Sequence, residues 1–413
     1  MTEPDGGPRR PGTLGRRQAA RLGLAALLTA GCASPGPAAP ARELVAALLD
    51  RRAAALLERD ARAWAATDAS GTGPDSLWAR TAAVPLGGWA YEVTGAEADS
   101  ATATVEATLR YRLRDEDPAP ATARRLLDLV RRDGRWRVRA EQAAPGAPEQ
   151  LWDQGTVGAR RGKWGTVLGT GEQDGVRAVA RLAERAVPAA DDAWGGDWAR
   201  RVVVLVPGSL AETAALLDGE PDAYRGVAAV TTGSPGPGTP ADRIVVNPEA
   251  YAELDDRGRQ FVLTHETAHV ATRSVTGPAT PLWLSEGFAD WAAHRAAPRP
   301  LTASAPALTA ALARGEPPRA LPADDDFAFD GDADALDRAY EGGWLACRLV
   351  ADRWGPDRLR ALYRAVGAHG ERNGAEQAAL RDVLGTTPAE FTAAWRAYLG
   401  ERLGGSGGRG PGA

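Results

Sequence analysis

The stretch "THETAH" (264–269) places two of the four histidines of the chain four positions apart. On a helix, His265 and His269 would lie one above the other on the same face, so both imidazoles could point at one ion. Glu266 would stand beside that ion without having to bind it. Two neutral nitrogen ligands and a nearby carboxylate are what a zinc hydrolase needs, because zinc acidifies a water and the carboxylate takes its proton. The spacing therefore predicts a metal-binding helix, although a helix can also carry two histidines on its surface.

A third ligand has to come from another element, because two histidines and a water leave zinc one protein donor short. Glu286 in "TPLWLSEGFADWAAH" (280–294) lies far enough along the chain to sit on a second helix packed against the first. Asp290 is one turn further on the same face, where it could accept the N–H of a ligating histidine and fix its tautomer. Two carboxylates four apart can also mark a solvated helix face. These two are surrounded by large apolar residues, namely Trp283, Leu284, Phe288 and Trp291, which favours a buried role.

"HETAH" followed by "WLSEGFAD" resembles the gluzincin metallopeptidases, the group that contains thermolysin and the aminopeptidase N family, and is most similar to exported peptidase MA-like proteins. The resemblance is sharp over 263–294 and looser over 160–403. It implies a single zinc ion, Zn²⁺, and a role for each matching residue: ligands His265, His269 and Glu286, general base and acid Glu266, and Asp290 as hydrogen-bond partner of a ligand.

A third segment, "YEGG" (340–343), resembles the "YEKG" segment of aminopeptidase-like gluzincins. The resemblance implies that Tyr340 stabilises the oxyanion, and the alternative is a tyrosine at an interhelical contact. The chain has no counterpart of the Gly-x-Met-Glu-Asn loop that holds a free N-terminus in aminopeptidases, since its only methionine is Met1. We therefore expect an endopeptidase in preference to an aminopeptidase. Peptidases of this type bind substrate as an added strand at a sheet edge, for which "GVAAVTT" (226–232) and "RIVVNP" (243–248) are the candidates.

The elements around these motifs predict a small mixed sheet followed by a mainly helical lobe, and we assign 150–403 to a peptidase MA-like domain. Alternating or continuous apolar runs predict strands, and apolar residues at helical spacing predict helices. The expected strands are 163–169, 201–207, 226–232 and 243–248. The expected helices are 175–187, 210–217 and 256–273, and the chain from there to about Leu403 reads as helical.

The preceding part of the chain, 42–145, has a different pattern. One long helix or two are expected over 42–68, then a half-buried strand over 101–113 and two strands over 126–141 that turn at Asp133-Gly134. Helices followed by a meander of long antiparallel strands resemble the cone-shaped NTF2-like α+β fold. The overall fold class is therefore α+β. No catalytic dyad is visible in this part, so a spacer or docking module is favoured over an enzyme.

The N-terminus has the features of an export signal. "LGLAALLTA" (22–30) follows several arginines and is too short to span a bilayer. "LLTAGC" (27–32) resembles a bacterial lipobox, which implies that residues 1–31 are a lipoprotein signal peptide and that Cys32 carries the lipid. An uncleaved anchor or an ordinary secretory signal is the alternative. Residues 32–41 would form a Pro/Ala tether, and 404–413 a disordered tail.

Two functions from different classes follow. The first is a zinc metallopeptidase that acts on a peptide or protein and is anchored by lipid on the extracytoplasmic face of the cell membrane. The second is a catalytically inactive zinc-binding lipoprotein that serves binding or assembly in the cell envelope. The presence of Glu266 favours the first, because a purely structural site would need no base. A net charge of −5 without a basic stripe argues against a nucleic-acid partner.

Overall fold

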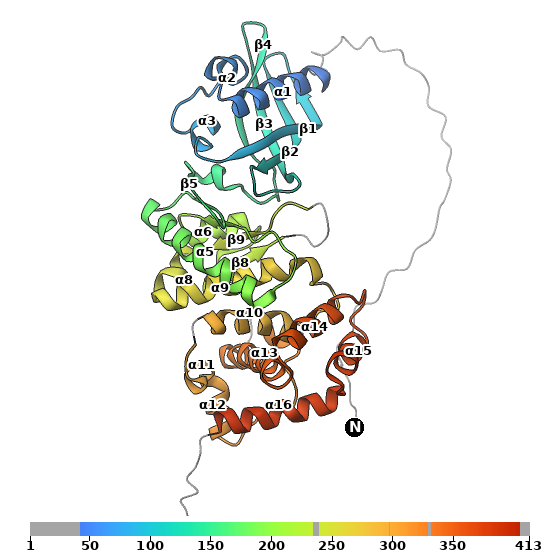
Figure 1. Cartoon of the computed structure of the whole chain (residues 1–413). Coiled ribbons are helices and arrows are strands. Elements are labelled where there is room, and N and C mark those ends of the chain that lie inside the picture. Colours follow the sequence, from blue (N-terminus) through green and yellow to red (C-terminus); the bar gives the residue numbers. More distant parts are fainter. Residues whose placement is uncertain (1–41, 234–238, 297, 329–331, 405–413) are drawn as a thin grey trace, which may run out of the picture. The chain divides into compact units, whose positions relative to one another are not determined.

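The computed structural model describes residues 42–233, 239–296, 298–328 and 332–404, which all belong to one compact unit (Figure 1). Cys32, the signal peptide, the tether and the tail from residue 405 onward lie outside the described residues. The chain is a mixed α+β protein with two small sheets, as the sequence predicts. Within the described ranges, no helix is both long and apolar enough to cross a membrane.

The first sheet is a four-stranded antiparallel meander with α1 packed against β1 (Figure 1). The helical pattern over 42–68 resolves into two helices, because Asp60 accepts the backbone N–H groups of Arg62 and Ala63 and so starts the second. Asp133 and Gly134 both have positive φ, 51° and 75°, which suits the tight hairpin predicted there. The bounds are α1 Arg42–Glu58, α2 Ala61–Thr67, α3 Leu77–Arg80, β1 Leu86–Ala98, β2 Thr102–Leu113, β3 Ala121–Arg132 and β4 Arg135–Ala143.

A network of buried charges lies between α1 and this sheet, next to the apolar cluster that joins them. Arg52 forms ion pairs with Glu141 at 2.6 Å and with Asp68 at 3.0 Å, and Arg125 binds the other Glu141 oxygen at 3.2 Å. Arg125 also donates to both carboxylate oxygens of Asp153, at 2.8 and 2.6 Å. Burial raises the pKa of Glu141, but the two guanidiniums outweigh that effect and hold the pKa below its usual value.

The second sheet has the strand order β5-β6-β7-β9-β8, in which β6, β7 and β9 are parallel and the two outer strands antiparallel. Its first strand, β5, is not predicted by the sequence pattern. The predicted helix over 175–187 continues through Pro188 and ends at Trp194. The bounds are α4 Leu151–Gln154, β5 Gly158–Gly162, β6 Gly165–Gly169, α5 Gln173–Trp194, β7 Val202–Val206, α6 Leu210–Leu216, α7 Pro221–Tyr224, β8 Ala229–Thr232 and β9 Arg243–Val246.

This strand order corrects one of the two candidates for the substrate-binding edge. The stretch 243–248 forms β9, which is hydrogen-bonded to β7 on one side and to β8 on the other, so it offers no free edge. Its Pro248 is the first residue of helix α8. The stretch 226–232 contains β8, which is the last strand in the order and therefore an edge strand. Strand β8 also packs against helix α9.

The remainder of the chain is helical, as predicted, and contains the largest buried apolar cluster. In this cluster α10 packs against both α9 and α13 (Figure 1). Cys347 is fully buried in this cluster. The bounds are α8 Pro248–Glu253, α9 Asp256–Thr272, η1 Arg273–Val275, α10 Leu282–Ala296, α11 Leu301–Ser304, α12 Pro306–Ala313, η2 Asp324–Phe327, α13 Ala333–Trp354, α14 Pro356–Gly367, α15 Ala375–Ala379, η3 Leu380–Leu384 and α16 Pro388–Leu403.

Candidate metal centre

Helix α9 carries the "HETAH" stretch in its interior. The helix begins at Asp256 and is capped by Asp255, whose side chain accepts the backbone N–H of Gly258 at 2.6 Å. His265 lies more than two turns further on, so its backbone and that of His269 are held by regular helical hydrogen bonds. His265 and Glu266 are buried, with 9% and 7% of their surface exposed. His269 is half-buried, with 19% of its side chain exposed. The helix therefore directs both histidines toward the protein interior.

Helix α10 brings the third candidate ligand because it crosses α13 at very close range. A Cβ atom at position 287 would overlap the carbonyl group of Gly343, so Gly287 is required for this approach. Gly343 in turn lies against the backbone of Trp283. The glycines of "SEGF" and "YEGG" are thus a packing pair. Their contact brings the helix that carries Glu286 against the helix that carries Tyr340.

Three donor atoms converge in the space between α9 and α10. The Nε2 atoms of His265 and His269 are 3.0 Å apart, and Oε2 of Glu286 lies 3.3 Å from the first and 3.4 Å from the second. These three side chains form the one group of at least three potential ligands found within the described ranges. We call them the metal triad. The triad could hold a metal ion.

The dimensions of the triad fit a small tetrahedral ion. With metal–ligand distances of about 2.0–2.1 Å, neighbouring ligands of a tetrahedral ion are separated by about 3.4 Å. The three measured separations, 3.0 to 3.4 Å, come close to this value. The donor set consists of two imidazole nitrogens and one carboxylate oxygen, the chemistry that zinc accepts in catalytic sites.

Asp290 orients one member of the triad. Its Oδ1 lies 2.8 Å from Nδ1 of His265, and the side chain is 7% exposed. A carboxylate in this position holds the proton on Nδ1, which leaves the lone pair of Nε2 directed at the triad. Burial lowers the pKa of His265, but hydrogen bonds to Asp290 and Glu286 raise it more, so the pKa lies well above its usual value. The site is thus built to hold positive charge.

The carboxylate of Glu286 shows the same preference. Burial raises the pKa of Glu286, but the imidazoles of His269 and His265 lower it by more. The pKa therefore falls well below the usual range. The group is therefore ionised under all ordinary conditions, as a metal ligand must be.

Glu266 points to the edge of the second sheet. The hydroxyl of Thr231 in strand β8 donates a hydrogen bond of 2.6 Å to Oε2 of Glu266. This contact fixes one carboxylate oxygen next to the free edge of β8. Glu266 is not part of the metal triad, yet its charge is near enough to raise the pKa of His265. It is therefore beside the triad and available for proton transfer.

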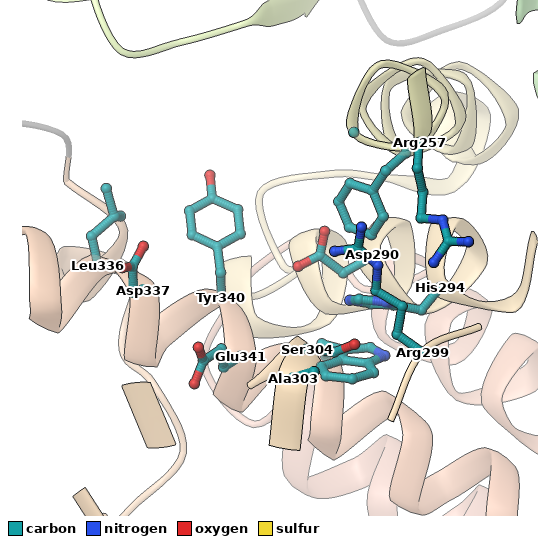
Figure 2. A pocket seen from close by; sticks show the side chains of 13 residues that line it. Arg257, Asp290, His294, Arg299, Ala303, Ser304, Leu336, Asp337, Tyr340 and Glu341 are labelled. Carbon is teal, nitrogen blue, oxygen red and sulfur yellow. The ribbon is translucent and has the colours of Figure 1, made fainter. Parts of the chain in front are cut away.

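Tyr340 lies on the wall of a cavity next to the triad, and Figure 2 shows its hydroxyl pointing into open space. Burial raises the pKa of this phenol, and the carboxylates of Glu286, Asp290 and Glu266 raise it further. The hydroxyl is therefore protonated at neutral pH and remains a hydrogen-bond donor. Within the part of the chain that the structure describes, it has no hydrogen-bond partner.

The structure thus brings His265, His269, Glu286 and Asp290 into contact, with Glu266 beside them and Tyr340 in the adjoining cavity. Sequence reasoning missed Thr231, for which the only signal is its place in an edge strand. His294 also lines this cavity, where its imidazole stacks on Trp344 with ring centroids 3.8 Å apart. In comparisons with known proteins, no family model and no curated protein matches the chain.

Proposed function

We propose that this protein is a zinc-dependent metallopeptidase of the gluzincin type. The observation that carries the proposal is a triad of three donors, instead of four, with a separate buried carboxylate beside it. Structural zinc sites are usually closed by four protein ligands, whereas catalytic sites keep a position for water or substrate. The competing proposal is an inactive zinc-binding lipoprotein. It assigns no chemical role to Glu266.

The proposed chemistry assigns a task to each residue. His265, His269 and Glu286 would hold the zinc ion, which would polarise the substrate carbonyl and lower the pKa of a water molecule to about 7. Glu266 accepts a proton from the attacking water and delivers it to the leaving amine. Thr231 keeps the Glu266 carboxylate in place, and Asp290 does the same for the ring of His265. Tyr340 donates a hydrogen bond to the oxyanion that develops on the carbonyl.

Strand β8 is the proposed docking edge for the peptide. Its free side has no partner strand among the described residues, and Thr231 links it directly to Glu266. A peptide added as the next strand would be held by backbone hydrogen bonds, which are independent of its sequence. This mode of binding fits internal bonds of a chain, in keeping with the preference for an endopeptidase.

The N-terminal part is proposed to be an NTF2-like docking or spacer module. Two observations support a supporting role over a catalytic one. An apolar core and the paired charges around Glu141 occupy the space between α1 and its sheet. The loop after β2 also contacts the second sheet, where the fully buried carboxylate of Asp117 binds Arg243 at 2.9 Å. We further propose that Cys32 carries the lipid anchor that holds the protein at the extracytoplasmic face of the membrane.

The test is peptide hydrolysis by the fragment that follows Cys32. Wild type, Glu266→Gln and the control Glu253→Gln, at an exposed position on α8, are incubated with a mixed peptide library, and zinc is measured in each. We expect cleavage by wild type and control, and a loss of about 10²–10⁴-fold in Glu266→Gln with zinc retained. Cleavage that is unchanged in Glu266→Gln would refute the assigned base. Zinc in all three proteins without any cleavage would favour the inactive lipoprotein.

A further inference from the structure

A cavity of about 410 Å³ adjoins the metal triad and has no role in the chemistry proposed so far. The cavity shares two residues with the site, Asp290 and Tyr340 (Figure 2). A peptide bound at the triad would therefore place a residue next to its cleaved bond at the entrance of the cavity. Its volume is large enough for one long side chain. The residues that line it therefore decide which side chain is accepted.

The floor of the cavity is aromatic. His294 stacks on Trp344 at 3.8 Å with an angle of 26° between the rings, and Phe261 meets His294 edge-on at 4.7 Å. Burial lowers the pKa of His294 to about 4; the charge of Asp290 opposes this shift, and nearby arginines add to it. The imidazole is therefore neutral at pH 7. Such a floor suits the methylene groups of a long side chain.

The charges at the wall are unequal. Arg257 and Arg299 both line the cavity, and within the described ranges Arg257 has no ion pair, while Arg299 has only a long, exposed one of 3.8 Å to Asp255. In Figure 2 both arginines lie on one side of Tyr340, and Asp337 lies on the other.

The two remaining carboxylates of the wall are already engaged. Glu341 accepts the backbone N–H groups of Ala307 and Leu308, at 2.9 and 2.6 Å, and Asp290 is bound to His265. On the side of the cavity next to the arginines, the long contact between Arg299 and Asp255 is therefore the one ion pair among the described residues that offsets their positive charge.

We propose that this cavity is a subsite for a carboxylate group of the substrate, next to the bond that is cleaved. The inference rests on the proposed peptidase function and adds the substrate class. Guanidinium groups pair with carboxylates through two parallel hydrogen bonds, which gives both charge and geometric selection. The hydroxyl of Ser304, which lines the same cavity and is buried without a partner among the described residues, supplies another donor. The carboxylate comes from an acidic side chain or from the C-terminus of a peptide.

Matched peptides separate these two sources. The two peptides of the first pair are identical except for Glu or Gln at one internal position adjacent to the cleaved bond, and this position is tested first on one side of the bond and then on the other. The two peptides of the second pair differ only in having a free or an amidated C-terminus. For the wild type we expect kcat/KM to be about tenfold or more higher for the member with the carboxylate, in one pair or the other. The pair that responds identifies the source, and equal values in both pairs would overturn the inference.

Charge variants test the arginines directly. The double variant Arg257→Gln/Arg299→Gln should remove the preference, and Arg257→Glu/Arg299→Glu should reverse it in favour of lysine at the same position. Arg319→Gln is the control, because Arg319 is exposed and does not line the cavity. Both single variants should give intermediate preferences. A preference that survives the double charge reversal in a folded protein would contradict the assignment.

Binding distinguishes failure of the subsite from failure of the peptidase function. The zinc-loaded Glu266→Gln protein is titrated with the same peptide pairs by calorimetry. Carboxylate-dependent binding that the arginine double variant abolishes, without cleavage by wild type, would retain the subsite and overturn the peptidase function. Cleavage by wild type with no carboxylate preference in rate or binding would do the opposite. The absence of both binding and cleavage would overturn both.

Discussion

Glu141 in the first sheet and Glu286 on α10 are both buried carboxylates with a pKa held below the usual range, but their surroundings differ in kind. Around Glu141, two guanidiniums and a tyrosine hydroxyl saturate both oxygens. Around Glu286, the neighbours are two imidazole nitrogens at 3.3 and 3.4 Å, each able to act as an acceptor itself.

The comparison shows that a buried charge does not by itself indicate a function. A network whose donors and acceptors are matched within the chain stabilises a fold and has nothing left to offer a ligand. A cluster of converging lone pairs, by contrast, can bind a cation. The first kind of cluster should therefore respond to mutation through stability, and the second through metal binding and rate.

Metal removal should have the largest effect of all on peptide cleavage, and it should leave the structure of the N-terminal part almost unchanged. Treatment with a chelator is expected to abolish peptide cleavage, and zinc should restore it. Zinc at 100 times its dissociation constant should raise the free energy of unfolding by about 2.7 kcal/mol. Hydrolysis kinetics and denaturant unfolding measure both effects. Cleavage that persists after complete removal of metal would contradict the account.

Glu141→Gln should destabilise the fold strongly, because it leaves two buried guanidiniums short of a charge. We expect a loss of about 3–5 kcal/mol in the free energy of unfolding. Urea unfolding measures it, with Glu106→Gln on the exposed face of β2 as control. The folded fraction should still bind zinc. A loss of zinc affinity in folded protein would show that the two clusters are not independent.

Tyr340→Phe should reduce kcat by about 10²–10³-fold, the usual effect of removing one oxyanion donor. The ring contact with Phe327 is kept, since only the hydroxyl is lost. Zinc content and unfolding free energy should stay at the wild-type values. Steady-state kinetics check the prediction, and an unchanged kcat would reduce Tyr340 to a packing residue.

Asp290→Asn should weaken zinc binding by about 10–100-fold, because the partner of His265 loses its charge. Competition with a zinc-binding dye measures the affinity. The comparison with Glu141→Gln is the sharper test, since both variants neutralise a buried carboxylate. If Asp290→Asn lowered the unfolding free energy of the metal-free protein as much as Glu141→Gln does, the distinction between the two clusters would fail.

The smallest of the expected effects is a difference between wild type and Glu141→Gln in how the free energy of unfolding depends on pH. The folded-state pKa of Glu141 is lowered, so its stabilising contribution is present above the unfolded pKa of about 4.3 and is lost as the pH falls through the folded pKa. The stability of wild type should therefore approach that of the variant as the pH drops below about 4. Unfolding curves from pH 7 to 3 provide the measurement, and a constant difference over that range would be inconsistent with a lowered pKa.

The parts of the fold that sequence predicted are those with strong local patterns. The alternation in 101–113 predicted strand β2, and the Asp133-Gly134 turn predicted the hairpin of β3 and β4. The four-residue spacing of His265 and His269 predicted their shared helix face. Strand β1 was missed, because Gly87 and Gly88 directly follow its first residue, Leu86, and a glycine pair is typical of a turn. The end of α5 was placed too early, because Pro188 usually stops a helix.

The errors at the site come from contacts between distant residues. The position of β9 inside the sheet depends on a crossover from β7 that no local pattern encodes, so 243–248 was taken as a possible edge. The link from Thr231 to Glu266 and the meeting of Arg257 with Arg299 at one cavity also join residues that are far apart in the chain. The glycines of "YEGG" were noted for their resemblance, whereas the structure explains Gly343 through the close crossing with Gly287.

Zinc stoichiometry in purified ligand variants tests the central claim most directly. Elemental analysis after dialysis should give one zinc per chain in wild type and in Glu266→Gln. His265→Ala, His269→Ala and Glu286→Ala should each retain almost none while keeping their helical circular dichroism. Equal zinc content in all five proteins, or no zinc in wild type supplied with the metal, would contradict a metal centre formed by these three side chains.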